Sequence, residues 1–489
     1  MLGGLLIVFS VLTVRSRFDD LDMWWHLKTG EIIWKTHTIP LADTFSYTTH
    51  NHALIPQEWL AEVTIYGAYK WGAFPGLMTW LCLFTALLLI AGYVFCSLYC
   101  GNSKVAFVGA LVIWWFSTAG LAIRPQMIGY LLMVVEMAVI HLGRTRDSRW
   151  FFGLPILFAI WINCHASFIL GMVVAGIYLF SSFFWFQSGS LEARRWDTQC
   201  RRRLALSLVL SAGAVFLNPA GIRQVWYPFD SILNMTTLLR SVDEWKPAQM
   251  TDGRGIALMA VLLCSFVLVM TRRSELFWDE FLLLTLATWM AVSHVRMMVF
   301  FGILAAPILS RQLSTLWDGY DAAKDRIWPN AAMLGISALV VILAFPSNRY
   351  LEQQVEDTSP VKAVQFIKSS HLQGPMLNDY GVGGYLIWAA PEQPVFIDSR
   401  TDLYEWAGVL DEYMSWATLE SDPRALLQKY GVNYCLLASY SPMVKVLLLL
   451  HEWKIVYTDK NFVILVHTAP VAPAVSSASD GAPIQPTAK

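Results

Sequence analysis

The sequence predicts a polytopic α-helical membrane protein that ends in a small α/β domain. Of its 489 residues, 56% are apolar and only 15% are charged, and the mean hydropathy is +0.48. A soluble globular protein carries nearer a quarter charged residues. The apolar residues come in repeated blocks of roughly 15–25, the length that crosses a bilayer as a helix. The net charge of −1 offers no general attraction to nucleic acid, so we expect membrane lipids and no nucleic acid as partners.

Eleven apolar segments qualify as candidate membrane-spanning helices, the first of them at the N-terminus. That segment lacks the basic start and the small-residue cleavage site of a secretory signal, so it is interpreted as a first span. The predicted spans cover residues 2–14, 77–99, 105–122, 126–142, 151–163, 167–186, 204–217, 256–270, 280–292, 296–310 and 330–346. For the shortest of these segments, of ~13 residues, a re-entrant or broken helix is the alternative.

Basic residues in the short loops predict the orientation of the chain in the membrane. The arginine-rich loops are residues 144–149, 194–203 and 272–273. Under the eleven-span count all three lie on one side, which is predicted to be cytoplasmic because cytoplasmic loops carry an excess of Lys and Arg. Arg15 and Arg17 fall on the opposite side. The polar loops 15–76 and 218–255, and everything after residue 347, are then extracytoplasmic.

The chain changes character after the last predicted span. Residues 1–346 are the predicted transmembrane domain, 347–468 a soluble extracytoplasmic α/β domain, and 469–489 a disordered tail rich in Ala, Pro and Ser. Within the soluble domain the strand-like segments are VFID, YCLLAS, KIVYT and FVILVH, and the helical ones lie near 358–370, 402–416 and 421–430. The last two strands are separated only by DKN, which predicts a β-hairpin.

The first long loop, residues 15–76, carries the densest group of chemically active side chains. In the segment RFDDLDMWWH, which begins at Arg17, a helix would bring Asp19, Asp22 and His26 to one face. Carboxylates beside tryptophans at a membrane surface suit a general base whose pKa is raised. They also suit a divalent cation, Mg²⁺ or Mn²⁺, for which Asp20 and Asp22 are candidate ligands. The alternative is an interfacial belt of tryptophans with acids that only solvate the loop.

This loop resembles that of a known group of membrane enzymes. The similarity covers Asp20–Leu27, Gly30, Ile39-Pro40, Asp43–Tyr47 and Glu58–Leu60, and it extends to RPQ at 124–126, NCH at 163–165, Asn218-Pro219 and FIDSRTD at 396–402. These motifs resemble bacterial polytopic proteins related to the GT-C glycosyltransferases, a superfamily that includes protein mannosyltransferases, oligosaccharyltransferases and lipid A aminoarabinose transferases. The resemblance implies a GT-C-like protein of the bacterial inner membrane, with one or two catalytic acids in the first extracytoplasmic loop and a polyprenyl-phosphate or -diphosphate sugar donor.

The resemblance implies that the catalytic acid is Asp20 or Asp22, and the sequence does not distinguish between the two. His26 and Glu58 in the same loop would orient that acid or ligate the metal. Arg124 lies at the end of one predicted span, just before Pro125 begins the next helix. A cation beside a helix N-terminus favours a bound anion.

Further candidate substrate-binding residues lie in other predicted outer turns. His294 and Arg296 stand between apolar runs, where polar groups are costly unless they face a cavity or a partner. The alternative for Arg124 and Arg296 is snorkelling to the interface, and for His165 it is a hydrogen-bonded packing role. Asp398 and Arg400 form either a salt-bridged turn or a loop that contacts the acceptor.

The sequence therefore leads to one main hypothesis and one alternative. The main hypothesis is an inverting glycosyltransferase in which Asp22 or Asp20 deprotonates a lipid, glycan or protein acceptor. Arg124 and Arg296 would stabilise the leaving lipid phosphate. The alternative is a non-enzymatic protein, either a transporter of lipid-linked glycans or a membrane assembly scaffold. A transporter is disfavoured, because charge is scarce within the predicted spans.

Overall fold

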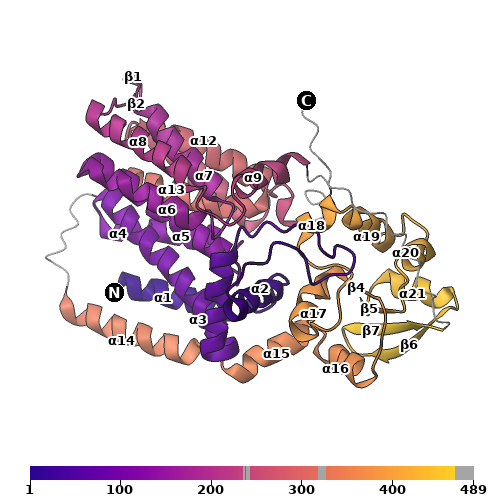
Figure 1. Cartoon of the computed structure of the whole chain (residues 1–489). Coiled ribbons are helices and arrows are strands. Elements are labelled where there is room, and N and C mark those ends of the chain that lie inside the picture. Colours follow the sequence, from indigo (N-terminus) through magenta and orange to yellow (C-terminus); the bar gives the residue numbers. More distant parts are fainter. Residues whose placement is uncertain (235–236, 238–242, 318–325, 469–489) are drawn as a thin grey trace, which may run out of the picture.

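The computed structural model describes residues 1–234, 237, 243–317 and 326–468. A helical bundle lies beside a sheet that carries the C-terminal helices, with α17 (Gly383–Ala389) and α18 (Thr401–Trp406) between them (Figure 1). The helices of the bundle are α1 (Leu2–Val14), α2 (Met23–Thr36), α3 (Trp59–Cys100), α4 (Ser103–Ser117), α5 (Gln126–Thr145), α6 (Leu154–Trp161), α7 (Phe168–Ser181), α8 (Thr198–Ala214), α9 (Ile222–Asn234), α11 (Gly253–Met270), α12 (Trp278–Ser293), α13 (Met298–Ser314) and α14 (Ile327–Ala344).

Five helices among the described residues are long and apolar enough to cross a membrane. They are Trp59–Cys100, Gln126–Thr145, Gly253–Met270, Val295–Ser314 and Ile327–Ala344, and four shorter apolar helices are Leu2–Val14, Ser103–Ser117, Ser148–Trp161 and Phe168–Ser181. All nine overlap predicted spans. The two remaining predicted spans, 204–217 and 280–292, fall on α8 and α12, which are shorter than the five. The apolar helices indicate an integral membrane protein, and the count of eleven spans stays a prediction.

Two predicted spans extend beyond their helices. The predicted span 167–186 is too long, because α7 ends at Ser181 and the chain then forms a hairpin of β1 (Phe186–Ser188) and β2 (Leu191–Ala193). Gly189 turns this hairpin with a φ of +61°, which glycine adopts without steric cost. The predicted span 105–122 is also too long, because α4 ends at Ser117 and a turn leads to Pro125.

The first long loop is more helical than the apolar runs indicate. Residues 59–71 belong to α3, which continues to Cys100 across a break at Gly72 and Ala73. Pro75, just after the break, lacks a backbone N–H and prevents a straight helix there. The start of α3 packs closely on α2, because a Cβ atom on Gly30 would lie only 2.2 Å from the carbonyl oxygen of Glu62.

The C-terminal part is a four-stranded sheet with helices on both faces. Its elements are α15 (Asn348–Thr358), α16 (Val361–Ser369), β4 (Met376–Asn378), α17 (Gly383–Ala389), α18 (Thr401–Trp406), α19 (Val409–Ala417), α20 (Pro423–Lys429), β5 (Tyr434–Ala438), α21 (Pro442–Leu449), β6 (Trp453–Thr458) and β7 (Phe462–His467). The strand order is β4-β5-β7-β6, with β4 parallel to β5 and the other pairs antiparallel. Alternate residues of β5 enter two hydrophobic cores, Cys435 and Leu437 in one and Leu436 in the other. The predicted tail, 469–489, lies outside the described residues.

The strand predicted at VFID is wrong, because Val395–Asp398 forms no ladder within the sheet. Val395 makes a single parallel bridge to Ser46 in the first long loop, and Thr48 donates its hydroxyl hydrogen to the carbonyl oxygen of Phe396 at 2.5 Å. This segment therefore forms hydrogen bonds with the first loop and with the side chain of Asn378 in β4, and it adds no strand to the sheet. The first loop and the C-terminal part are joined along this seam.

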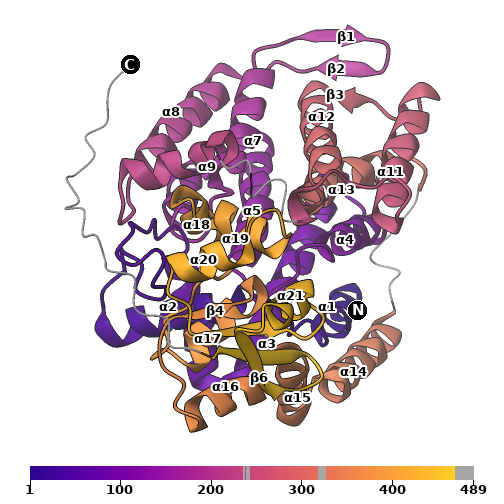
Figure 2. The ribbon, with the colours of Figure 1, turned by 90° about the vertical axis from the view of Figure 1, so that its right-hand side faces the viewer.

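The three arginine-rich loops gather at one end of the bundle. Arg144, near the end of α5, lies 3.0 Å from Asp279 in α12, and Arg194 after β2 lies 3.3 Å from Glu275. Arg203 in α8 donates to the hydroxyl of Ser148. The β1–β2 hairpin and the C-terminal sheet lie at opposite ends of the molecule (Figures 1 and 2).

Candidate active site

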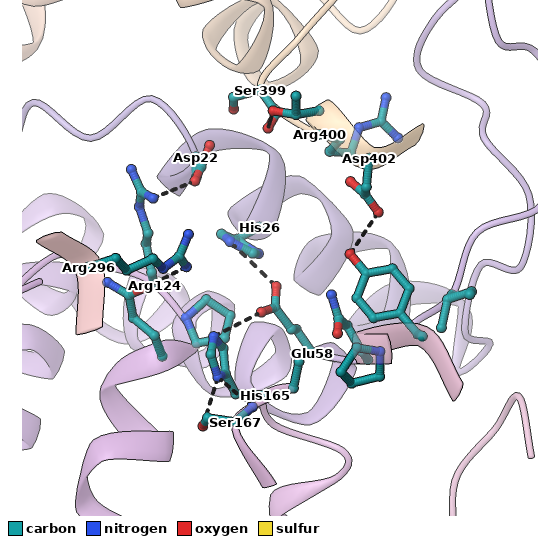
Figure 3. Close-up of a pocket in the computed structure, with 18 of the residues that line it drawn as sticks. Asp22, His26, Glu58, Arg124, His165, Ser167, Arg296, Ser399, Arg400 and Asp402 are labelled. Atoms are coloured by element: carbon teal, nitrogen blue, oxygen red, sulfur yellow. Dashed lines mark hydrogen bonds and ion pairs between the residues drawn. The ribbon is translucent and has the colours of Figure 1, made fainter. Parts of the chain in front are cut away.

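Asp20 and Asp22 meet Arg124 at the entrance to α2. Asp22 is the N-cap of α2, and its backbone N–H donates to Asp20 Oδ1 at 2.8 Å, which fixes the turn before the helix. Arg124 approaches from the turn between α4 and α5. Its Nε lies 2.6 Å from Asp20 Oδ2. Its Nη1 lies 2.8 Å from Asp22 Oδ2, a contact that Figure 3 shows. One guanidinium thus holds both candidate acids.

Arg296 lies beside this group and has fewer charged partners. Its Nη2 donates to the side-chain oxygen of Gln126 at 2.8 Å, and its guanidinium stacks on the ring of Trp245. The carboxylate of Glu244 lies near both arginines, 3.7 Å from Arg124 and 3.5 Å from Arg296. His294 secures the same segment, because its Nδ1 lies 2.7 Å from the carbonyl oxygen of Trp245.

Glu58 lies between two histidines from different elements. Its Oε2 is 3.8 Å from Nε2 of His26 in α2, and its Oε1 is 3.8 Å from Nε2 of His165 in the turn after α6 (Figure 3). The other ring nitrogen of each histidine is engaged as well. His26 Nδ1 lies 3.0 Å from Glu62, and His165 Nδ1 lies 2.9 Å from the hydroxyl of Ser167.

Asn163 explains why Glu58 and His165 come together. Its Oδ1 accepts the indole N–H of Trp59 at 2.7 Å, and its backbone oxygen accepts the N–H of Leu60. Its amide nitrogen donates to the carbonyl oxygens of Ala159 and Leu217. A single buried side chain thus joins the start of α3 to the turn that bears His165.

Arg400 and Asp398 form a buried ion cluster with Asp43 of the first long loop. Arg400 makes two contacts with the Asp398 carboxylate, at 2.8 and 2.7 Å, and its Nη1 lies 2.6 Å from Asp43. Tyr404 donates to Asp398 at 2.6 Å. Both carboxylates are fully buried. The cluster fixes the neighbouring segment 399–402, in which Asp402 accepts a hydrogen bond from the Tyr227 hydroxyl at 2.9 Å.

These groups line one cavity of about 910 Å³ between the bundle and the C-terminal part. Of the residues singled out in the sequence, those that line it are Asp22, His26, Glu58, Arg124, His165, His294, Arg296 and Arg400. Asp20 and Asp398 are not part of the lining and lie behind Arg124 and Arg400. One wall is apolar, and its side chains come from α7, α12 and α13: Leu170, Val173, Leu286, Trp289, Met290 and Phe300.

Burial and neighbouring charges give two of the carboxyl groups that line this cavity, Glu58 and Asp22, opposite protonation states. Burial raises the pKa of Glu58 to about 8, and Asp22 and Asp402 add to the rise while the arginines oppose it. Burial would also raise the pKa of Asp22, but Arg124, the hydroxyl of Ser399 and Arg296 outweigh it and lower this pKa. At neutral pH Asp22 is therefore ionised, whereas Glu58 holds a proton.

The two histidines are neutral for the same reason. Burial lowers the pKa of His26 to about 3, although Asp22 opposes the shift. Burial, reinforced by Arg296, lowers the pKa of His165 to about 3.

Sequence reasoning missed several residues that the fold brings to the cavity. They are Glu62, Gln126, Ser167, Tyr227, Glu244, Tyr380, Ser399, Thr401 and Asp402. Four of them had a signal in the sequence, because Gln126 belongs to the RPQ motif and Ser399, Thr401 and Asp402 belong to the FIDSRTD motif. The others are ordinary polar residues, and only the folding of distant segments against one another brings them to the cavity.

The donor set around Asp20 and Asp22 does not fit a divalent cation. Both carboxylates are already paired with the guanidinium of Arg124. Within the described part of the chain, no group of three or more His, Cys, Asp or Glu side chains is arranged to hold a metal ion. A cation at Asp20 and Asp22 would have to displace Arg124, so we assign no chemical step to a metal.

Comparison with known proteins gives matches in structure alone, since no protein-family model and no curated protein matches this chain. The archaeal oligosaccharyltransferase AglB from Archaeoglobus fulgidus, in complex with an inhibitory peptide and a dolichol-phosphate, has a TM-score of 0.53 at 12% identity. The match covers 89% of this chain and 69% of that one. The same protein in complex with Zn and sulfate has a TM-score of 0.52 at 12% identity, covering 88% of this chain and 67% of that one.

The second protein with this fold matches over nearly its whole length. ArnT from Cupriavidus metallidurans, bound to undecaprenyl phosphate, has a TM-score of 0.51 at 12% identity and covers 96% of this chain and 98% of its own. The similarity to AglB and ArnT concerns the path of the backbone and not the side chains. The chain therefore shares its backbone fold with AglB and ArnT.

Proposed function

We propose that this protein transfers a sugar from a polyprenyl-phosphate or polyprenyl-diphosphate donor to an acceptor at the extracytoplasmic face of the membrane. The observation that carries the proposal is the pairing of two arginines with an apolar wall in one cavity. Arg124 and Arg296 line the same cavity as the apolar side chains from α7, α12 and α13. An amphiphile with an anionic head and an isoprenoid chain matches this distribution of charge and apolar surface.

Asp22 is placed and ionised for the role of general base, although its pKa is lowered and not raised as expected from the sequence. It lines the cavity, it is ionised because its pKa is lowered, and Arg124 fixes its orientation. In the proposed step the acceptor oxygen attacks the anomeric carbon while Asp22 takes the acceptor proton. The bond from that carbon to the phosphate oxygen breaks, and its electron pair leaves with the lipid phosphate. Arg124 and Arg296 stabilise the charge that develops there.

The side of the cavity formed by α9 and the C-terminal part suits a polar acceptor or the sugar itself. Ser399, Thr401 and Asp402 come from the C-terminal part, and Tyr227 comes from α9. Hydroxyl and carboxyl groups of this kind bind the hydroxyl groups of sugars through hydrogen bonds. The buried cluster of Arg400, Asp398 and Asp43 holds this segment in place, which makes Asp398 and Arg400 positioning residues in the proposal.

The proposal is tested with the purified protein in lipid nanodiscs. A radiolabelled undecaprenyl-phosphate hexose is added with a membrane lipid extract as the source of acceptor, and the release of undecaprenyl phosphate is measured. We expect release that depends on the protein and on Asp22, together with label in a second product. Binding without release would favour an assembly scaffold. Movement of the intact donor between leaflets, again without release, would favour a transporter, and either result would overturn the proposal.

A further inference from the structure

The environment of Glu58 points to a second proton-transfer role, which rests on the proposed function. Glu58 is the N-cap of α3, and its two oxygens face His26 and His165 at 3.8 Å each. Both distances are too long for a hydrogen bond. The carboxyl group therefore lies between the two rings without a hydrogen bond to either. It can rotate toward an incoming ligand. Contacts of this kind often tighten only when substrate binds.

The contacts of His165 fix which of its nitrogens carries the hydrogen. Its Nδ1 accepts the backbone N–H of Ser167 at 3.1 Å. The Ser167 hydroxyl, 2.9 Å from the same nitrogen, accepts the indole N–H of Trp161 and so has its own hydrogen available for Nδ1. A neutral imidazole that accepts at Nδ1 carries its hydrogen on Nε2. That N–H faces Oε1 of Glu58.

One arrangement of hydrogens then satisfies the rest of the chain of contacts. With an N–H facing Oε1, the proton of a neutral Glu58 carboxyl is on Oε2. Oε2 faces Nε2 of His26, which accepts if the hydrogen of this ring is on Nδ1. Nδ1 in turn lies 3.0 Å from Oε1 of Glu62, which accepts it. In this arrangement His165 presents an N–H to Oε1 of Glu58, and His26 presents an acceptor nitrogen to the proton on Oε2. No two hydrogens then face each other.

The charged groups around Glu58 come from several elements, and burial dominates over them. Burial raises its pKa to about 8, with the negative charges of Asp22 and Asp402 in the same direction and Arg296 and Arg124 in the other. Asp22 in the same cavity is ionised. Two carboxyl groups whose environments separate their pKa values in this way suit one acid and one base.

We propose that Glu58 is the general acid that protonates the departing phosphate, and that His165 and His26 are positioning residues that direct its proton. In the step, the acceptor oxygen bonds to the anomeric carbon and its proton passes to Asp22. The carbon–oxygen bond to the phosphate breaks with its electron pair on oxygen, and that oxygen takes the Glu58 proton. Asp22 then releases one proton to water and Glu58 takes one up, so protons balance over the turnover.

The first test needs no substrate. In the nanodisc-bound protein, infrared spectroscopy follows the carbonyl stretch of protonated carboxyl groups during a pH titration. We expect a band that persists at neutral pH, disappears near the Glu58 pKa of about 8, and is missing in Glu58→Gln. A spectrum of Glu58→Gln identical to that of the unchanged protein throughout the titration would overturn the assignment, whatever reaction the protein catalyses.

The second test uses the radiolabelled undecaprenyl-phosphate hexose that the unchanged protein cleaves. Glu58→Gln should lower kcat by about 10²–10⁴-fold and remove the alkaline fall in activity. His165→Ala removes an N–H that favours the ionised carboxyl, so its alkaline limb should move to higher pH with little change in KM. Glu352→Gln, at an exposed site on α15, is the matched control.

The outcomes separate this inference from the proposed function. If the unchanged protein cleaves no donor, the proposed function is wrong, and the infrared titration still decides the protonation of Glu58. If the protein cleaves the donor but Glu58→Gln keeps the full rate and the alkaline limb, the general acid is wrong and the function stands. If Glu58→Gln does not fold, an unshifted alkaline limb in His165→Ala overturns the proposal.

Discussion

Arg400 Nη1 lies 2.6 Å from Asp43 Oδ1, although the two residues are 357 positions apart in the sequence. Asp43 belongs to the first long loop, and Arg400 directly precedes α18 in the C-terminal part. Both are buried, and Asp398 completes the neutralisation of the arginine. The pair therefore joins the loop that carries Asp22 to the segment that carries Asp402, and it closes the cavity between them.

Asp43→Asn should destabilise the protein because it leaves the buried Arg400 only partly neutralised. Breaking a buried ion pair by removing one partner costs about 3–5 kcal/mol, so a clear drop in melting temperature is expected in nanodiscs. Lys35→Gln is the control, because Lys35 is 63% exposed and its pair with Glu31 is worth about 0–1 kcal/mol. An unchanged melting temperature for Asp43→Asn would show that the pair does not hold the two parts together.

Asp22→Asn should abolish sugar transfer while the protein still folds and inserts. The amide cannot take the acceptor proton, and general-base catalysis contributes about 10²–10⁴-fold to the rate. The measurement is release of undecaprenyl phosphate from the labelled donor. Asp19→Asn is the matched control, because this neighbouring carboxylate is exposed and does not line the cavity. Transfer that survives in the Asp20→Asn/Asp22→Asn double variant contradicts the assignment.

Arg296→Gln should weaken the binding of undecaprenyl phosphate. A hydrogen bond to a charged group contributes about 1.5–3 kcal/mol, which corresponds to a rise in Kd of roughly 10–100-fold. Tryptophan fluorescence is a suitable readout, because Trp245 and Trp289 line the same cavity. Arg223→Gln, an exposed arginine in α9, should leave Kd unchanged. Equal affinities for Arg296→Gln and Arg223→Gln would remove Arg296 from the phosphate site.

Gly30→Ala should lower stability by about 1–3 kcal/mol through overpacking. The new Cβ would lie 2.2 Å from a backbone oxygen of α3, and the backbone cannot move aside without separating α2 from α3. Gly176→Ala in α7 is the matched control, because nothing lies within 4 Å of the new methyl group, and the exchange removes the cost of a helical glycine. Thermal unfolding of both variants tests this, and a Gly30→Ala protein as stable as Gly176→Ala contradicts the close approach.

The buried histidines should lower the stability as the pH drops below about 6.5, whereas the raised pKa of Glu58, about 8, acts in the opposite direction. The histidine contribution is therefore measured as the difference between His165→Asn and the unchanged protein. The pKa of His26 and of His165 is about 3 in the folded protein and about 6.5 in an unfolded chain. Unfolding therefore takes up protons below about pH 6.5, and the stabilisation is lost progressively as the pH falls toward 3. Melting temperatures across this range should fall less steeply for His165→Asn. The same slope in both proteins would contradict a buried neutral His165.

The sequence by itself predicted the long apolar helices and most of the Asp, Glu, His and Arg residues that line the cavity. Long apolar runs have one stable solution in a bilayer, because a helix satisfies every backbone hydrogen bond within the segment. Residues such as Arg124, His165 and Arg296 stood out because charged or polar groups between apolar runs are costly without a role. Composition and local chemistry carry these signals, and both can be read without knowing the fold.

Only the tertiary structure decided which of these residues act on one another. Asp20 and Asp22 were equivalent in the sequence, but the approach of Arg124 leaves Asp22 lining the cavity and puts Asp20 behind it. Glu58 is protonated because burial raises its pKa, and it lies between His26 and His165, which come from two other elements. The segment Val395–Asp398 had the composition of a strand and pairs with the first loop instead. Such outcomes depend on burial and on contacts between distant segments, and local sequence carries no record of either.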